Sequence, residues 1–151
     1  MNCCNYKSPF GSIILQEENG VLTMVKFGHC SEQGESALLQ ETSRQLDEYF
    51  SGKRKEFDLP HKAEGTLFQQ KVWQALQQIP YGTTVCYKDI AEAIGSSKAC
   101  RAVGMANHNN PICIIVPCHR VIGANGSLVG YAEGPDVKQK LLELEAEYAR
   151  I

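Results

Sequence analysis

A cysteine and a histidine that are adjacent in the chain are the residues best suited to covalent chemistry. Cys118 stands at the end of an apolar run and is followed by His119. A thiolate is the nucleophilic form of cysteine, and a neighbouring imidazole or cation lowers the pKa of the thiol. An isolated Cys-His pair is more often a buried structural cysteine beside a turn. Here Pro117 directly before it, Arg120 directly after it and Asn110 upstream favour a functional nucleophile.

Composition narrows the classes of protein to consider. The chain has 151 residues, 43% of them apolar, which is enough for one large domain or two small ones. It has no run of eighteen apolar residues and no N-terminal signal pattern, so we expect an intracellular protein without a membrane span. Its seven cysteines form no C-x-x-C pair, which favours free thiols in a reducing compartment.

Charge is distributed unevenly along the chain, whose net charge is −2. Residues 1–60 contain six basic and nine acidic residues, whereas residues 61–151 contain nine basic and eight acidic residues. A DNA contact requires a local basic surface, and only the second part of the chain permits one.

The first part of the chain has the pattern of a small α/β domain. Two apolar runs, residues 12–16 and 21–27, flank an Asn-Gly pair at residues 19–20, which predicts a β-hairpin. Apolar residues at helical spacing predict a helix over residues 35–50. Polar residues and a proline in the segment 57–65 indicate a linker.

The second part has the pattern of a helical domain. Thr66 and Gln69 predict a capping box at the start of a helix. Residues 87–94 predict another helix, and a third, capped by Ser96 or Ser97, runs to about residue 106, so the two form a helix-turn-helix.

A last helix is expected to begin at Pro135, because proline suits the first helical turn. Its expected apolar face comprises Val137, Leu141, Leu144 and Tyr148. Residues 123–126 before it have the composition of a hairpin-type turn.

Three motifs together resemble one protein family. Pro-Cys-His-Arg-Val at residues 117–121 is similar to the active-site signature of the 6-O-alkylguanine-DNA alkyltransferases, also called methylated-DNA–protein-cysteine methyltransferases. Arg-Ala-Val-Gly at residues 101–104 and Asn-Pro at 110–111 resemble the recognition helix and asparagine loop of that family. The likeness extends over residues 66–147, and residues 1–60 resemble the variable N-terminal domain more loosely.

The resemblance implies a fold and an activity. The expected fold is α+β, with a ribonuclease H-like α/β domain containing an antiparallel sheet at residues 1–60. A mostly helical, winged-helix-like domain with the helix-turn-helix is expected at residues 63–151. The implied function is DNA repair by direct reversal. An alkyl group moves irreversibly from the 6-oxygen of guanine, and from the 4-oxygen of thymine, to Cys118, once per molecule and without a cofactor.

The resemblance also assigns catalytic roles. Cys118 is the alkyl acceptor, and His119 is its base, acting through a bound water. Glu145 orients His119 and stabilises its positive charge. Asn110 braces the active-site loop. Tyr87 helps to rotate the damaged nucleotide and donates a hydrogen bond to the departing guanine.

DNA contacts are implied in the same way. The target oxygen lies inside the duplex, so the damaged base must be extruded. Arg101 resembles the arginine finger that fills the gap in the base stack, and Ala102 lies beside it on a slim recognition helix suited to the minor groove. Tyr87, Ser97 and Arg120 are the other expected DNA contacts.

The base pocket is expected to follow the active-site segment. Tyr131 resembles the residue on which the extruded base lies. The backbone groups of Val121 and Ala132 are expected to read the guanine edge. Glu133 stands where the family commonly has a small residue, which predicts a narrower pocket.

Partners and metals follow from the same comparison of motifs. The expected partner is double-stranded DNA containing alkylated guanine, bound by a monomer in the cytoplasm, or in the nucleus of a eukaryote. Some family members bind zinc through their N-terminal domain. Four residues here, Cys3, Cys4, His29 and Cys30, do not reproduce that ligand pattern, so we expect no metal.

Other classes of protein explain less of the sequence. A lesion-binding relative would lack the acceptor cysteine, which is present as Cys118. A helix-turn-helix transcription regulator leaves residues 117–121 without a purpose. In a cysteine hydrolase the catalytic histidine usually comes from a distant segment. An adaptive-response regulator would carry additional zinc-binding and regulatory domains.

Overall fold

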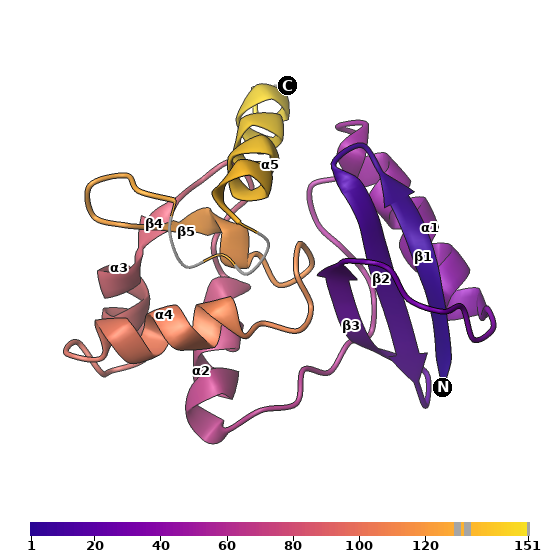
Figure 1. Cartoon of the computed structure of the whole chain (residues 1–151). Helices are drawn as coiled ribbons and strands as arrows, with labels where there is room; N and C mark the ends of the chain where they lie inside the picture. The colour runs from indigo at the N-terminus through magenta and orange to yellow at the C-terminus, as the bar shows by residue number, and fades with distance from the viewer. Residues whose placement is uncertain (129–130, 132–133, 151) are drawn as a thin grey trace. The chain divides into compact units, whose positions relative to one another are not determined.

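The structure, a computed structural model, describes residues 1–128, 131 and 134–150. These residues form two compact units (Figure 1). The first contains residues 1–64 together with 111–115, and the second contains residues 65–110 and the described chain from residue 116 onward. An antiparallel sheet in the first unit and mostly helices in the second confirm the α+β class.

The sheet of the first unit contains the predicted hairpin. Strands β2 (Gly11–Glu18) and β3 (Val21–Phe27) are antiparallel, and β1 (Asn2–Ser8) pairs with β2 to give the order β1-β2-β3. Asn19 and Gly20 connect β2 and β3 with φ angles of 54° and 82°. Two consecutive positive φ angles are the geometry that an Asn-Gly hairpin turn favours.

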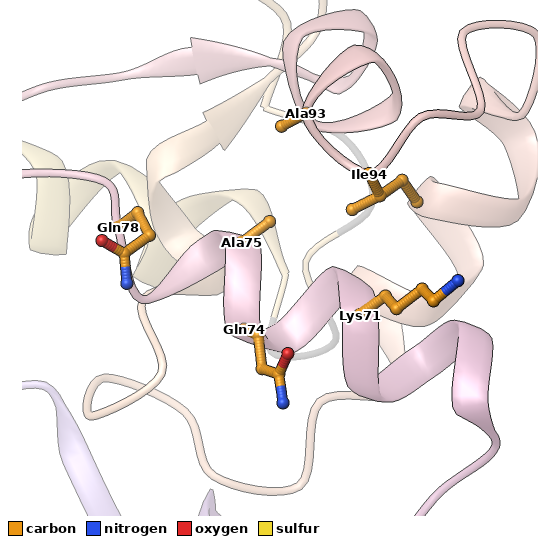
Figure 2. A pocket seen from close by; sticks show the side chains of 6 residues that line it. All are labelled: Lys71, Gln74, Ala75, Gln78, Ala93 and Ile94. Atoms are coloured by element: carbon orange, nitrogen blue, oxygen red, sulfur yellow. The ribbon is translucent and has the colours of Figure 1, made fainter.

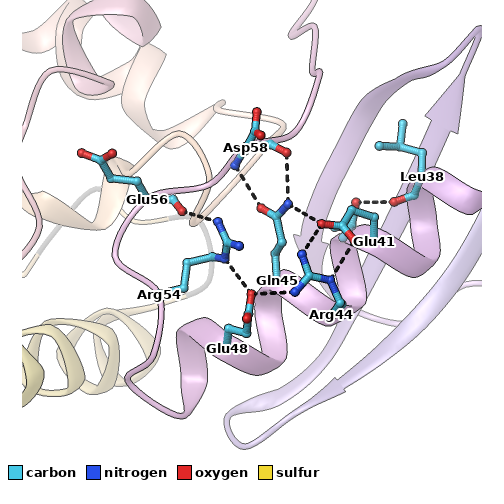
Figure 3. Close-up of polar contacts among 9 residues, drawn as sticks. Leu38, Glu41, Arg44, Gln45, Glu48, Arg54, Glu56 and Asp58 are labelled. Atoms are coloured by element: carbon cyan, nitrogen blue, oxygen red, sulfur yellow. Dashed lines mark hydrogen bonds and ion pairs between the residues drawn. The ribbon is translucent and has the colours of Figure 1, made fainter.

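Helix α1 (Ala37–Phe50) packs against β1 and β2. The Ser36 hydroxyl accepts a hydrogen bond from the Leu39 amide and caps the helix, so α1 begins two residues later than predicted. The buried amide of Gln45 accepts from the Asp58 backbone and donates to its carbonyl, both at 3.0 Å (Figure 3). Through these bonds α1 holds the following segment of the first unit in place.

The outer edge of β3 is closed by two short segments. Leu22 donates to the carbonyl of Pro60 and accepts from Lys62, and Val25 donates to Pro111 and accepts from Cys113, at 2.8–2.9 Å. An uncovered sheet edge exposes unpaired backbone groups, so these bonds complete the sheet. Residues 111–115 therefore belong to the first unit, although in the sequence they separate the two segments of the second unit.

The second unit contains the predicted helix-turn-helix. Helix α2 (Leu67–Leu76) begins with the expected capping box, in which Thr66 and Gln69 bond each other's backbone amides. Helices α3 (Tyr87–Ala93) and α4 (Cys100–His108) pack against each other and against α2. The predicted serine cap of α4 is wrong. Ala99 occupies that position without a side-chain bond, because a backbone turn bonds the Ala99 amide to the Ser96 carbonyl at 2.8 Å.

Two further contacts assemble this unit. The buried Trp73 indole donates a hydrogen bond of 2.8 Å to the carbonyl of Ala106, which joins α2 to α4. Strands β4 (Val85–Cys86) and β5 (Val121–Ile122) pair in parallel, and the 3-10 helix η1 (Cys118–Arg120) directly precedes β5. The turn predicted at residues 123–126 is present, and the strand before it pairs with β4.

Helix α5 (Pro135–Tyr148) begins at the predicted proline but buries a different face. Its buried residues are Lys138, Leu141 and Glu145, whereas the predicted Val137 and Leu144 are only half-buried. Leu141 is buried as expected, but the buried face as a whole is not apolar, because two charged side chains turn inward. In the described part of the chain, no helix is long and apolar enough to span a membrane.

We expect Thr66→Ala to lower the free energy of unfolding by about 1 kcal/mol, because it removes the capping oxygen of α2. Urea denaturation monitored by circular dichroism measures this loss. Ser97→Ala is the matched control, because Ser97 is exposed and α4 has no side-chain cap. An equal loss in both variants would contradict the role assigned to the capping box.

Candidate active site

The thiol of Cys118 lies at the start of η1 and is only 3% exposed. The Cys118 amide donates to the Val116 carbonyl at 2.8 Å, which forms a tight turn before η1. The Asn110 amide group donates to the same carbonyl at 2.9 Å, and the Asn107 amide group donates to the Cys118 carbonyl at 3.2 Å. Two asparagines from the end of α4 and beyond it therefore hold the backbone around the thiol. Asn110 was singled out from the sequence, whereas Asn107 was not.

A buried charged cluster lies directly after the cysteine. His119 Nε2 is 2.7 Å from Glu145 Oε2. Arg120 donates from Nε to Glu145 Oε1 at 2.8 Å and from Nη2 to Oε2 at 2.9 Å. A third bond, from Arg120 Nη1 to the Ile79 carbonyl at 2.7 Å, occupies the other end of the guanidinium. The cluster joins η1 to α5 and brings together three residues that are at most 8% exposed.

The cluster keeps Glu145 ionised. Burial by itself would raise the pKa of this carboxyl, but the charges and hydrogen bonds of His119 and Arg120 outweigh it and hold the pKa well below its ordinary value. An ionised carboxylate only accepts hydrogen bonds, so His119 Nε2 is the donor in the 2.7 Å contact. The other ring nitrogen, Nδ1, is buried and has no partner among the described residues.

Arg120 is not placed to contact DNA, which corrects the expectation from the sequence. Its side chain is 8% exposed, and its guanidinium is held by Glu145 and Ile79. The adjacent position in the motif suggested a free positive charge beside the thiol. The carboxylate of Glu145, 25 residues further along the chain, draws the guanidinium inward instead.

Lys138 is a member of the site that sequence reasoning missed. The side chain is fully buried on α5, and Nζ lies 5.8 Å from the centre of the Tyr87 ring. Burial lowers the pKa of this ammonium to about 8, and the negative charge of Cys118 opposes that shift. A signal was present in the sequence: Lys138, Leu141 and Glu145 recur at the spacing of one helix face.

The remaining predicted pocket residues lie in the same unit. Tyr87 begins α3 and is half-buried; burial raises the pKa of its hydroxyl, and the charge of Cys118 raises it further. Tyr131 is buried, and Val121 is buried on β5. Ala132 and Glu133 lie outside the described residues.

The exposed face of α4 contains the predicted DNA-contacting residues. Arg101 and Ala102 are exposed, whereas Val103 and Ala106 face the core. Ser97 is exposed in the turn before the helix. The predicted recognition helix therefore exposes the short side chain of Ala102 next to the long, positively charged side chain of Arg101.

A separate hollow of about 340 Å³ lies between α2 and α3 (Figure 2). Its lining residues are Lys71, Gln74, Ala75, Gln78, Ala93 and Ile94. They include no thiol, so this hollow contains no candidate nucleophile.

We expect Glu145→Gln to destabilise the protein by about 3 kcal/mol at pH 7, because it leaves the buried Arg120 guanidinium without its carboxylate and weakens the bond to His119 Nε2. Stability also depends on pH with a definite sign. Because the folded-state pKa of Glu145 is lowered from 4.5, the unfolded chain binds the proton first as pH falls. Wild-type stability should therefore decline below about pH 4.5, and the variant should lose this part of the decline.

Urea denaturation across this pH range measures both effects. Glu143→Gln is the matched control, because Glu143 is exposed on the same helix and should change stability by no more than about 0.5 kcal/mol. A similar loss in the two variants would mean that the buried cluster contributes little.

Comparison with known proteins points to one family in both parts of the chain. Family models for 6-O-methylguanine DNA methyltransferase match it twice, the ribonuclease-like domain at residues 1–63 and the DNA binding domain at residues 67–147. The methylated-DNA–protein-cysteine methyltransferase of Methanosarcina acetivorans is 50% identical over 148 residues, covering 93% of this chain and 95% of the relative. The constitutive one of Bacillus subtilis is 46% identical over 151 residues, 92% of each chain.

Solved structures agree with these relatives. The Mycobacterium tuberculosis O6-methylguanine methyltransferase superposes with a TM-score of 0.90 at 43% identity, over 97% of this chain and 93% of that one. A DNA complex of the protein from the same organism superposes with a TM-score of 0.88 at 44% identity. The match covers 95% of this chain and 92% of that one. A family model for each part of the chain, relatives that match nearly its whole length and a shared fold lead to one conclusion: this chain belongs to the 6-O-methylguanine DNA methyltransferase family.

Proposed function

We propose that this protein repairs alkylated DNA by transferring the alkyl group from the 6-oxygen of guanine to its own Cys118. The observation that carries the proposal is the buried thiol of Cys118 directly beside the His119–Glu145–Arg120 cluster. Membership of the methyltransferase family agrees with this chemistry.

The cluster is arranged to make His119 a proton acceptor. Because Nε2 donates to the ionised Glu145, the neutral ring carries its lone pair on Nδ1. A buried nitrogen needs a partner, and a bridging water would supply one and relay the proton of Cys118. Arg120 is a positioning residue: its two bonds hold the carboxylate in the orientation that His119 requires.

The reaction is a displacement at the alkyl carbon. The sulfur of Cys118 forms a bond to this carbon, while the bond between the carbon and the 6-oxygen breaks. The electron pair leaves with guanine, and Tyr87 donates a hydrogen bond to the departing base. A thioether is stable, so each molecule reacts once. The same displacement at the 4-oxygen of thymine is chemically equivalent. The alkyl group and both electrons come from the reactants, so the step needs no cofactor.

Lys138 adds a positive charge where the thiolate forms. Its pKa of about 8 reflects burial opposed by the negative charge of Cys118. A cation close to a thiol favours the thiolate. Lys138 therefore assists the ionisation of Cys118, and Asn107 and Asn110 keep the backbone of this segment fixed.

DNA binding is assigned to the domain of residues 63–151, apart from residues 111–115, which complete the sheet of the first unit. The slim face of α4 enters the minor groove, and the extruded base leaves a gap that Arg101 fills. Ala102 and Ser97 contact the DNA next to the position of Arg101. Tyr131 and the backbone of Val121 then receive the base. The family resemblance gives Ala132, outside the described residues, the same role as Val121.

The cell compartment follows from the substrate. A protein that acts on chromosomal DNA must reach it, so we place this one in the cytoplasm, in contact with the nucleoid, or in a eukaryotic nucleus. It acts as a monomer, because one chain contains the thiol, its base and the recognition helix.

Incubation with duplex DNA containing 6-O-methylguanine should add one methyl group to the protein, mapped to Cys118 by intact mass and peptide analysis. Cys118→Ser should gain no mass. Cys113→Ser is the matched control, since Cys113 is another buried thiol close in sequence. Tight binding of damaged DNA without any gain in mass would refute alkyl transfer.

Arg101→Ala should slow reaction with the methylated duplex by about tenfold or more, because the gap left by the extruded base stays unfilled. Reaction with free 6-O-benzylguanine should keep its rate, since no base has to leave a stack. Lys71→Ala removes the same charge from α2 and serves as the control. An equal loss on duplex and free base would place Arg101 in the chemical step instead. Single-turnover mass spectrometry gives both rates.

A further inference from the structure

Two thiols in the first unit are in direct contact. The sulfur of Cys3 on β1 lies 2.8 Å from the sulfur of Cys30, in the segment that follows β3. Cys3 is 5% exposed, whereas Cys30 is partly exposed. The repair chemistry assigned to Cys118 gives this pair no role.

The alternation of side chains along β1 explains why Cys3, and not Cys4, contacts Cys30. Neighbouring residues of a strand point to opposite faces. Cys4 lies on the face covered by α1, because it lines a hollow together with Leu39 of that helix. Cys3 and Asn5 therefore share the opposite face, and both contact Cys30.

Hydrogen bonds fix the backbone on both sides of the sulfur pair. The Asn5 amide group donates to the Cys30 carbonyl at 2.8 Å, and its oxygen accepts from the Cys30 amide at 2.9 Å. The amide of Gln33 donates to the carbonyl of Cys3 at 2.9 Å. A disulfide has a sulfur–sulfur length of about 2.05 Å, so the two sulfurs need to approach by only about 0.8 Å to bond.

We propose that Cys3 and Cys30 are a redox-active dithiol that closes to an intramolecular disulfide when a peroxide oxidises the protein. The Cys30 sulfur attacks one peroxide oxygen, the oxygen–oxygen bond breaks, and the second oxygen leaves as water with the Cys30 proton. The Cys3 sulfur then attacks the Cys30 sulfur. A sulfur–sulfur bond forms, the sulfur–oxygen bond breaks, and a second water leaves with the Cys3 proton. The two thiols lose two electrons and the peroxide gains them.

The surroundings determine the order of the two steps. Burial raises the pKa of Cys3 to about 11, and its hydrogen bond to Cys30 contributes. Cys3 thus stays a protonated thiol, while the more exposed Cys30 meets the oxidant. No three His, Cys, Asp or Glu side chains in the described chain are placed to hold a metal ion.

The full-length reduced protein is treated with hydrogen peroxide, then unfolded and alkylated with iodoacetamide. Five of its seven thiols should remain alkylatable, and the protein should become lighter by about 2 Da before alkylation. Trypsin should release residues 1–7 joined to residues 27–44, and dithiothreitol should separate them.

Matched variants identify the sulfur on β1, because residues 1–7 contain both Cys3 and Cys4. The joined peptides should persist in Cys4→Ala and disappear in Cys3→Ala and in Cys30→Ala. Seven alkylated thiols in the peroxide-treated wild type would overturn the proposal. Joined peptides in Cys3→Ala would overturn it as well, because Cys4 would then be the partner.

Discussion

The ionised carboxylate of Glu145, buried between His119 and Arg120, is the interaction on which the reactive site depends. A buried charge is tolerated only when it is paired and fully hydrogen-bonded, and here four contacts of 2.7–2.9 Å satisfy the carboxylate and the guanidinium. The same bonds attach α5 to η1, which begins with Cys118. Stability and the proposed reactivity are therefore coupled: the carboxylate that holds His119 also joins the two elements that form the site.

Two arginines in this unit have opposite environments and hence opposite uses. The guanidinium of Arg120 donates hydrogen bonds to protein partners inside the unit, whereas Arg101 is exposed on α4. A buried arginine sets the geometry of its neighbours, and an exposed one on a slim helix is free to enter a groove of DNA. In the proposed function, the chemistry thus uses buried residues of η1 and α5, and recognition uses the surface of α4.

The cysteines differ in the same physical way. Cys118 interacts with the charge of the Lys138 ammonium, which favours the thiolate, while Cys3 faces another thiol and is kept protonated. Asparagine side chains fix the backbone at both sites: Asn107 donates to the Cys118 carbonyl, and Asn5 bonds the amide and carbonyl of Cys30, the partner of Cys3. The structure thereby assigns different chemistry to identical side chains.

The sequence by itself determined the features that depend on neighbouring residues. The Asn-Gly turn at residues 19–20, the capping box at Thr66 and the start of α5 at Pro135 follow from local backbone preferences, and the motif at residues 117–121 is contiguous. The inward turn of Arg120, the burial of Lys138 and the Cys3–Cys30 contact were decided only by the tertiary structure. Each depends on a partner some 25 residues away or on another element, and neither the local pattern nor the residue type specifies which partner the folded chain supplies.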